Sequence, residues 1–290
     1  MPSRLPVAVA LLLLLPLSPV LKEADAAGKV AGTLSIRDAL TAPGRPVMIE
    51  ARLVRAGLLG QTGLGGEQLE FIVEGKRAGT AMTGGDGRAL FEYTPRRRGF
   101  YAVKVTQSQS QRVESSEASA TVACWERRRP ILLVEFAALT DDTKVPPVPL
   151  PSLPLELGRR DRPTPAPDAA DELNRLTRFY YNVIYLVGGG DGDMGELGEV
   201  RAWLQDHKFP VGFSLTLQPG RTQLGPTIEG LRADGWDNLK AGVGRSREFA
   251  EALVAQRMEV VIVPEPDRGE LPNKAQVAKN WKEVRTKLHR

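Results

Sequence analysis

The stretch that decides the fold is Leu239-Lys-Ala-Gly-Val-Gly-Arg-Ser-Arg-Glu-Phe-Ala-Glu-Ala-Leu253, followed by Met258-Glu-Val-Val-Ile-Val-Pro264. Its pattern predicts a strand that enters a Gly-x-Gly turn, then a helix, then a second apolar strand. This order is typical of a parallel sheet with helices packed on its faces. We therefore expect an α/β domain in the C-terminal half of the chain.

The same alternation of strands and helices begins after Arg129. Pro130-Ile-Leu-Leu-Val-Glu-Phe136 is a continuous apolar run, as expected for a strand buried on both faces of a sheet. Asp168 is expected to cap the first helix. Helices are predicted at 168–180 and 227–233, around Phe249 and Leu253, and with one apolar face formed by Leu197, Val200, Trp203 and Leu204. A last helix carries Val277, Trp281, Val284 and Leu288, and the further strands are 182–187, 213–217 and 260–263. Residues 125–290 are therefore predicted to form a three-layer α/β domain with a parallel sheet, Rossmann-like in layout.

A proline-rich insertion interrupts this domain at residues 141–167. Its prolines are Pro146, Pro147, Pro149, Pro151, Pro154, Pro163, Pro165 and Pro167. This density of proline predicts an extended or disordered surface loop without helix or sheet. A ligand for a proline-binding partner is the alternative reading.

Residues 27–124 follow a different period. Apolar and polar residues alternate at 47–53, 69–73, 89–93 and 101–105, with turn residues between these runs. Such short alternating strands predict a β-sandwich. The segment from Gly79 to Val105 resembles a bacterial immunoglobulin-like domain, and Tyr101 is either its corner tyrosine or an ordinary core aromatic residue.

The N-terminus predicts export. Arg4 precedes an apolar run from Val7 to Leu15, and Ala24-Asp-Ala26 has the small residues of a signal-peptidase site. Residues 1–26 are therefore predicted to be a signal peptide; a buried N-terminal helix is the alternative. The mature protein is expected in the periplasm, the cell envelope or the extracellular space, and not as an integral membrane protein.

Charge and cysteine content exclude other classes. The formal net charge is +4, and basic residues cluster only in Arg96-Arg-Arg98 and Arg127-Arg-Arg129, so no nucleic-acid partner is expected. These triplets are predicted to be solvated faces or linker ends. Cys124 is the only cysteine, which excludes an intramolecular disulfide.

The order of elements after Arg129 resembles the haloacid-dehalogenase-like (HAD-like) superfamily, and within it the lipin-type phosphatidate phosphatase domain. The segments that carry the resemblance are Tyr185-Leu186, Glu199-Val-Arg-Ala-Trp-Leu204, Phe209-Pro210, Ala241-Gly-Val-Gly244, Ala250-Glu-Ala252 and Gly269-Glu-Leu271. The resemblance implies a magnesium-dependent phosphatase. In that family an aspartate ending the first strand attacks phosphorus, and a second aspartate two residues later transfers a proton to the leaving group.

The chain departs from this pattern at the catalytic positions. Glu135 stands at the nucleophile position, Ala137 at the acid–base position and Val187 at the second-strand hydroxyl position. Arg245 follows the Gly-x-Gly turn, and Phe249 stands at an acidic position. A longer carboxylate displaces its oxygens by about one bond, and a displacement of about 1 Å costs on the order of 100-fold in rate. We therefore expect no catalytic residues, no metal and no cofactor.

The leading hypothesis is an exported, non-catalytic binding or scaffold protein whose partner is an unidentified envelope protein or ligand. The alternative is a divergent phosphohydrolase that acts on a phosphate ester or phospholipid head group with Mg²⁺. Its residues would be Glu135, Asp141, Asp191 and Lys240, which would have to converge in one pocket. Ligand capture by the sandwich alone is a third possibility.

Overall fold

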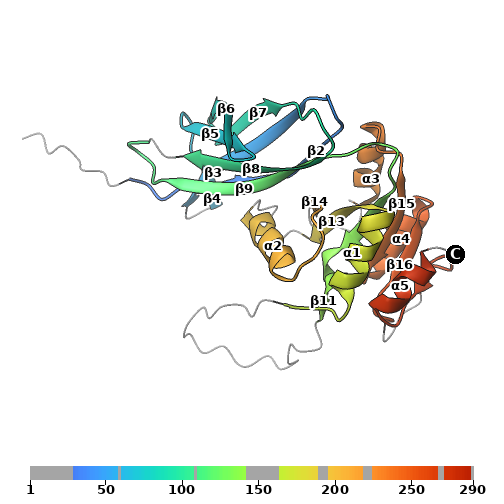
Figure 1. The fold of residues 1–290 in the computed structure, drawn as a ribbon. Coiled ribbons are helices and arrows are strands. Elements are labelled where there is room, and N and C mark those ends of the chain that lie inside the picture. The colour runs from blue at the N-terminus through green and yellow to red at the C-terminus, as the bar shows by residue number, and fades with distance from the viewer. Residues whose placement is uncertain are drawn as a thin grey trace, which may run out of the picture.

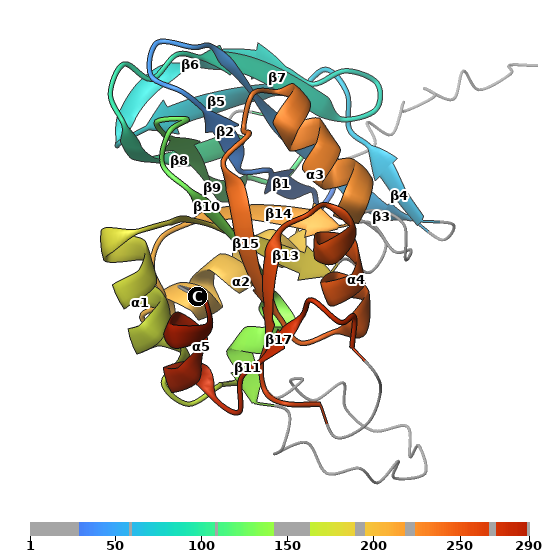
Figure 2. The same ribbon diagram turned by 90° about the vertical axis from the view of Figure 1, so that its right-hand side faces the viewer.

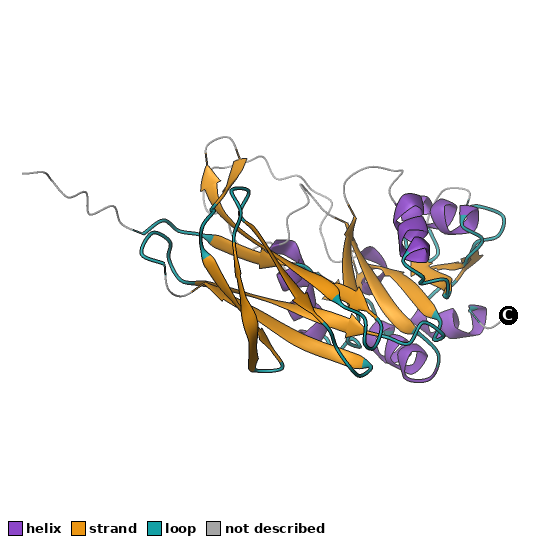
Figure 3. Ribbon diagram, turned by 90° about the horizontal axis from the view of Figure 1, so that it is seen from above, coloured by secondary structure: helices purple, strands orange, loops and turns teal. Residues whose placement is uncertain are grey.

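The computed structural model describes residues 29–57, 60–107, 110–141, 163–188, 195–217, 224–266 and 271–288. An N-terminal β-sandwich lies beside a C-terminal unit in which helices surround a parallel sheet (Figure 1). Seen from above, the helices gather in the second unit, and the first consists of strands and loops (Figure 3). The predicted signal peptide lies outside the described residues.

The sandwich has the two sheets that the period-two pattern predicts. The alternation buries one side of each strand: Ile49, Ala51 and Leu53 are 0% exposed, as are Leu69 and Phe71. One sheet contains β1, β3, β4 and β7, and the other has the order β2-β9-β8-β5-β6. The strands are β1 (Thr33–Ile36), β2 (Ala39–Thr41), β3 (Val47–Gly57), β4 (Gly60–Gly63), β5 (Gln68–Val73), β6 (Lys76–Met82), β7 (Arg88–Tyr93), β8 (Gly99–Gln107) and β9 (Ser116–Cys124). The predicted immunoglobulin-like fold of this region is confirmed.

Tyr101 is the corner tyrosine of this sandwich. Its hydroxyl donates to the Arg97 carbonyl at 2.7 Å and accepts from the Arg97 backbone N–H at 3.3 Å. A tyrosine at the start of this strand that bonds to the backbone just upstream is a hallmark of immunoglobulin-like domains. The ring also packs against Tyr93, so the residue serves the core as well as the corner.

The second unit contains a six-stranded sheet with the order β14-β13-β10-β15-β16-β17, in which each neighbouring pair of strands is parallel. The predicted parallel sheet is therefore present. Its strands are β10 (Ile131–Glu135), β13 (Asn182–Gly188), β14 (Phe213–Leu217), β15 (Leu239–Gly244), β16 (Glu259–Ile262) and β17 (Gln276–Val277). The helices are η1 (Phe136–Leu139), α1 (Ala169–Phe179), α2 (Gly195–Asp206), α3 (Leu224–Ala233), α4 (Arg247–Ala255) and α5 (Trp281–Lys287).

Helices cover both faces of this sheet (Figure 2). Leu132 and Val134 of β10 pack with residues of α1, α2 and α5 on one face. Ile131 and Leu133 face the other way and pack with α3 and α4. Because both sides of β10 are buried, its sequence is continuously apolar rather than alternating.

Three local predictions were wrong. Val277 lies in β17 rather than in the last helix, because it pairs with Ile262 at the edge of the sheet. Pro165 lies in β12 (Thr164–Pro165), which pairs with β11 (Thr140–Asp141). Proline, which has no backbone N–H to donate, is tolerated in so short an edge strand because β12 has no second partner strand in the described part of the chain. Asp168 does not cap α1 through its side chain: its φ is 61°, and its carboxylate forms an ion pair with Lys282 at 3.3 Å.

The two units share apolar packing at their junction. Trp125, directly after β9, is 4% exposed and makes edge contacts with the rings of Phe100 and Trp236. Ala123 and Trp125 belong to the same buried cluster as α3 and α4. No helix among the described residues has the length and apolar character needed to span a membrane.

Candidate functional site

The candidate site is the edge of the parallel sheet where β10 and β15 end. Glu135 is the last residue of β10, and Arg245 and Ser246 follow β15. The chain continues from β10 to β13 on one side and reaches β15 on the other, so the strand order reverses at β10. In open parallel sheets, ligands bind outside the carboxyl ends of the strands at such a reversal.

Glu135 is held by the beginning of α4. Its Oε2 accepts from the backbone N–H groups of Arg245 at 2.6 Å and Ser246 at 2.9 Å. Its Oε1 accepts from the Ser246 hydroxyl at 2.6 Å, and that hydroxyl oxygen also accepts from the Phe249 N–H at 3.1 Å. The first N–H groups of a helix attract anions. The Glu135 carboxylate is therefore bound by the residues that lead into this helix start.

The residues at this edge do not fit a magnesium ion. Both oxygens of Glu135 accept hydrogen bonds from α4, Ala137 is an exposed methyl group, and Val187 is 4% exposed at the end of β13. Phe249 is buried under the strand. No group of three His, Cys, Asp or Glu side chains able to hold a metal occurs among the residues that the structure describes. Magnesium prefers carboxylate and phosphate oxygens in octahedral geometry, which the described residues of this edge do not provide.

Of the other residues of the phosphohydrolase hypothesis, Lys240 lies away from this edge. The segment that carries Asp141 contacts this edge, because the Arg245 side chain donates to the Thr140 carbonyl at 3.4 Å. Lys240 is the second residue of β15, whose first residue pairs with Ile131 at the start of β10. Glu135 ends β10, and strands rise about 3.3 Å per residue, so Lys240 lies toward the opposite edge of the sheet. Asp141 lies in β11, which pairs with β12 and not with the six-stranded sheet. Asp191 lies outside the described residues.

The two glycines of the predicted Gly-x-Gly turn lie inside β15, and they serve helix packing. A Cβ on Gly242 would lie 2.1 Å from Leu253 Cδ2, and a Cβ on Gly244 would lie 2.2 Å from Phe249 Cδ1. Both neighbours belong to α4, so only glycine allows this helix to lie directly on β15. Close helix–strand packing is one of the roles glycine has in such turns.

Gly244→Ala is therefore expected to lower the free energy of unfolding by about 1–3 kcal/mol, the usual cost of overpacking a core. The measurement is urea-induced unfolding followed by circular dichroism. Gly188→Ala is the matched control, because Gly188 also ends a strand and a Cβ there would have no atom within 4 Å. Equal losses in the two variants would contradict the packing role.

A second feature is a cleft between the sandwich and α2. Its volume is about 820 Å³, and its lining includes Ile72, Ala102, Lys104, Glu117, Arg201 and Val211. Figure 1 shows α2 lying between the sandwich and the parallel sheet. Clefts of this size at domain interfaces are common ligand sites.

Arg201, which lines this cleft, forms a buried ion pair with Asp38. The Asp38 carboxylate, 0% exposed, accepts from Arg201 Nη1 at 2.7 Å, from Thr121 N–H at 2.8 Å and from Ser214 N–H at 3.0 Å. Arg201 also donates to the Ser119 carbonyl. Burial raises the pKa of Asp38 above its ordinary value of 3.8, against the opposing effects of Arg201 and the two N–H donors. Sequence reasoning missed this pair, because nothing local links residues 163 positions apart.

No family model matches the chain, and no curated protein matches it. Solved structures similar to the N-terminal region include the CARDB domain of the PF1109 protein from Pyrococcus furiosus, with 14% identity and a TM-score of 0.22 over 32% of this chain and 90% of that one. The fibronectin(III)-like modules of CbhA from Clostridium thermocellum match with 14% identity and a TM-score of 0.23 over 32% of this chain and 94% of that one.

A longer match is a calcium-binding mutant of β-glucuronidase 2 from Bacteroides uniformis. Its identity is 10% and its TM-score 0.27, and the match covers 82% of this chain but only 36% of that chain. These likenesses concern fold alone. The structural neighbours of the N-terminal region are immunoglobulin-like and fibronectin-III-like domains.

Proposed function

We propose that the protein is an exported, non-catalytic binding or scaffold protein, in which an immunoglobulin-like sandwich is joined to a HAD-like domain that has lost its phosphatase residues. The observation that carries this proposal is the engagement of Glu135 by α4. A carboxylate that accepts three hydrogen bonds from one helix start is a structural anchor, and its oxygens are not directed at a substrate.

The strand order supports the proposed relationship of the α/β unit. Numbered along the chain, the six parallel strands lie in the order 3-2-1-4-5-6, which is the order of doubly wound Rossmann-type sheets. In such folds the first strand and the turn after the fourth strand supply the ligand-binding groups. In this protein the end of the first strand and the segment after the fourth strand are hydrogen-bonded to each other, through Glu135 and Ser246.

The interdomain cleft supports a binding role. It lies between two units that share buried apolar contacts, so its walls are held by both. The lining combines apolar side chains with the Lys104–Glu117 ion pair, whose Nζ and Oε2 are 2.5 Å apart. In the proposed role, a partner or ligand would bind in this cleft and would not be chemically altered.

Glu135→Gln tests the proposal. We expect no hydrolysis of a generic phosphate ester in the presence of Mg²⁺ by the wild type or the variant. The variant is expected to be less stable by about 1.5–3 kcal/mol, the range for hydrogen bonds to a charged group. The measurements are phosphate release and urea-induced unfolding of the same preparations.

Glu248→Gln is the matched control. Glu248 lies in the first turn of α4 and loses the same charge, but it does not bond to Arg245 or Ser246. It is expected to change the stability by only about 0.3–1 kcal/mol through the helix dipole. Magnesium-dependent hydrolysis that Glu135→Gln abolishes without loss of stability would support the phosphohydrolase instead.

A further inference from the structure

The two arginine triplets of the sequence come together at the junction of the two units. Arg96–Arg98 precede β8, and Arg127–Arg129 precede β10. Arg98 Nη1 lies 3.4 Å from Glu126 Oε1, and the ring of Phe100 lies against Trp125 with centroids 6.0 Å apart. These contacts place the triplets at the same end of the molecule, although they are distant in the sequence.

Two exposed aromatic side chains lie at this end as well. Arg129 donates to the Thr177 carbonyl in the last turn of α1. Phe179 is the last residue of α1 and Tyr180 follows it; they are 69% and 48% exposed, with ring centroids 6.3 Å apart. Adjacent aromatic residues this exposed leave apolar area in water, which marks interaction sites.

The six arginines divide into two groups. Arg98, Arg127 and Arg129 have structural contacts: Arg127 lies over the Trp236 ring at 5.6 Å and donates to the Asp234 carbonyl. The side chains of Arg96, Arg97 and Arg128 are exposed and form no hydrogen bond or ion pair with the residues that the structure describes. Arg178, next to Phe179, is exposed too. The fold holds one group in place and leaves the other available to a partner.

We propose that this end of the molecule, the arginine–aromatic patch (Arg96–Arg98, Arg127–Arg129, Arg178, Phe179 and Tyr180), docks on an anionic phospholipid surface. Guanidinium groups bind phosphate oxygens in bidentate fashion. Phenylalanine and tyrosine side chains insert at the level of lipid head groups. The patch combines both chemistries at one end of the molecule.

Lipid fits the patch better than nucleic acid does. Proteins that bind single strands line a groove with basic residues and stack successive bases on aromatic side chains along it. Here the aromatic residues project at the end of a helix.

The docking surface is separate from the Glu135 edge, because the two lie at opposite ends of β10. Arg129 lies just before the strand begins, and Glu135 is its last residue. The inference therefore goes beyond the proposed function and does not depend on it. A membrane-docked protein with an active Glu135 edge would leave the inference intact and overturn only the proposed function.

Vesicle co-sedimentation tests the inference with the full chain. The wild type is expected to bind vesicles of phosphatidylcholine with phosphatidylglycerol, to bind pure phosphatidylcholine vesicles weakly, and to lose binding as salt is raised. Replacing Arg96, Arg97 and Arg128 by Gln together is expected to weaken binding about 100-fold, at about fivefold per arginine. Phe179→Ala is expected to weaken binding to anionic vesicles a further several-fold and to leave the salt dependence unchanged.

The matched control replaces Lys29, Arg55 and Lys274 by Gln. These exposed residues carry the same total charge and lie away from the patch. A control variant that loses as much affinity as the patch variant would show only a net-charge effect and overturn the inference. Equal binding of the wild type to neutral vesicles, no binding to anionic vesicles, or preferential binding to a single-stranded oligonucleotide would overturn it as well.

Discussion

Asp38→Ala is expected to lower the free energy of unfolding by about 3–5 kcal/mol, the cost of breaking a buried ion pair by removing one partner. The substitution leaves Arg201, whose side chain is only 18% exposed, without its carboxylate. It also leaves the backbone N–H groups of Thr121 and Ser214 without their acceptor. Urea-induced unfolding followed by the fluorescence of Trp125 and Trp236, which lie in contact at the junction, measures the loss.

A double-mutant cycle separates the ion pair from the rest of the interface. Asp38→Ala combined with Arg201→Met is expected to be more stable than Asp38→Ala alone, because no uncompensated charge remains. Glu117→Ala is the control in the same cleft: its partner Lys104 is 46% exposed, and such pairs contribute only about 0.2–1 kcal/mol. A control as damaging as Asp38→Ala would refute the role of burial.

The effect of Asp38→Ala on the free energy of unfolding depends on pH in a direction that the pKa of Asp38 fixes. Burial raises the folded-state pKa of Asp38 above 3.8, so the folded protein takes up this proton at a higher pH than the unfolded chain. The stabilising contribution of Asp38 to the folded protein is therefore fully present below pH 3.8. It is lost as the pH rises through the raised pKa of the folded state. The stability difference between wild type and Asp38→Ala should grow from neutral pH to about pH 4. A difference that shrinks on acidification would contradict this direction.

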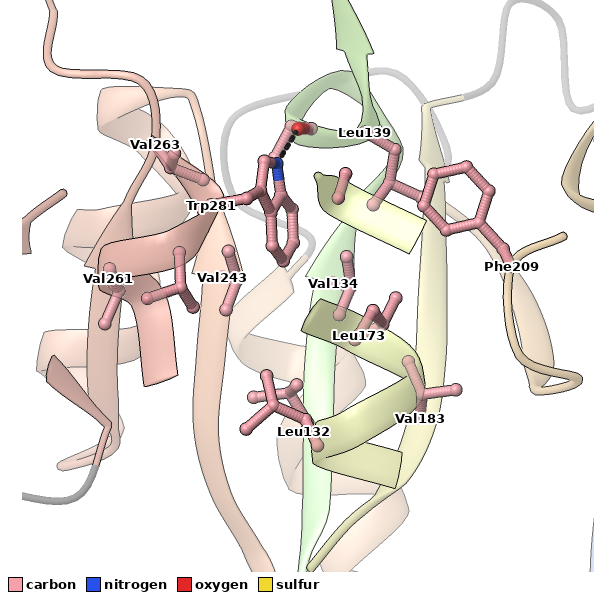
Figure 4. Close-up of a cluster of buried hydrophobic side chains, with 14 of the residues drawn as sticks. Leu132, Val134, Leu139, Leu173, Val183, Phe209, Val243, Val261, Val263 and Trp281 are labelled. Atoms are coloured by element: carbon pink, nitrogen blue, oxygen red, sulfur yellow. Dashed lines mark hydrogen bonds between the residues drawn. The ribbon is translucent and has the colours of Figure 1, made fainter. Parts of the chain in front are cut away.

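Trp281→Ala is expected to lower the free energy of unfolding by about 3–5 kcal/mol, the usual range for truncating a buried tryptophan. Trp281 is 2% exposed and packs among valines and leucines of β10, β15 and β16 (Figure 4). Its Nε1–H donates to the Ala138 carbonyl at 3.0 Å. Ala138 belongs to η1, which follows Glu135 directly, so the indole also supports the segment next to the candidate site.

Trp281→Phe separates the two contributions of this residue. It keeps an aromatic ring in the core but leaves the Ala138 carbonyl without its donor, which should cost about 1–3 kcal/mol. Lys282→Ala, on the exposed side of the same helix, should have a much smaller effect, because Lys282 is 68% exposed. Thermal unfolding of the three variants ranks their stabilities. Equal stabilities of Trp281→Ala and Trp281→Phe would mean that the lost hydrogen bond, rather than the lost packing, accounts for the destabilisation.

Much of the secondary structure could be predicted because its cause is local. Alternating residues such as Ile49, Ala51 and Leu53 require a strand with one buried face, and the structure has it in β3. The run from 213 to 217 is apolar enough to predict β14 with its observed bounds. Val277 was assigned wrongly because a helical stripe and a short edge strand can share the same apolar residue.

The candidate site could be predicted only in part. That Glu135 ends the first strand follows from the apolar run before it. Its hydrogen bonds to Arg245 and Ser246 do not, because they depend on β10 and β15 being neighbours in the sheet. The sequence predicted a Gly-x-Gly turn after the strand, whereas Gly242 and Gly244 lie inside β15 and are required by the side chains of Leu253 and Phe249.

By itself the sequence predicted several of the strands, most of the helices and the change from an alternating pattern to the pattern of a parallel sheet with helices. These properties follow from side-chain period and residue type, which act over a few neighbouring residues. Only the tertiary structure decided that Glu135 is tied to α4, that Asp38 meets Arg201 between the units, and that the arginine triplets share one end of the molecule. Each of these depends on which distant segments the packing of the core brings together, and no local pattern encodes that choice.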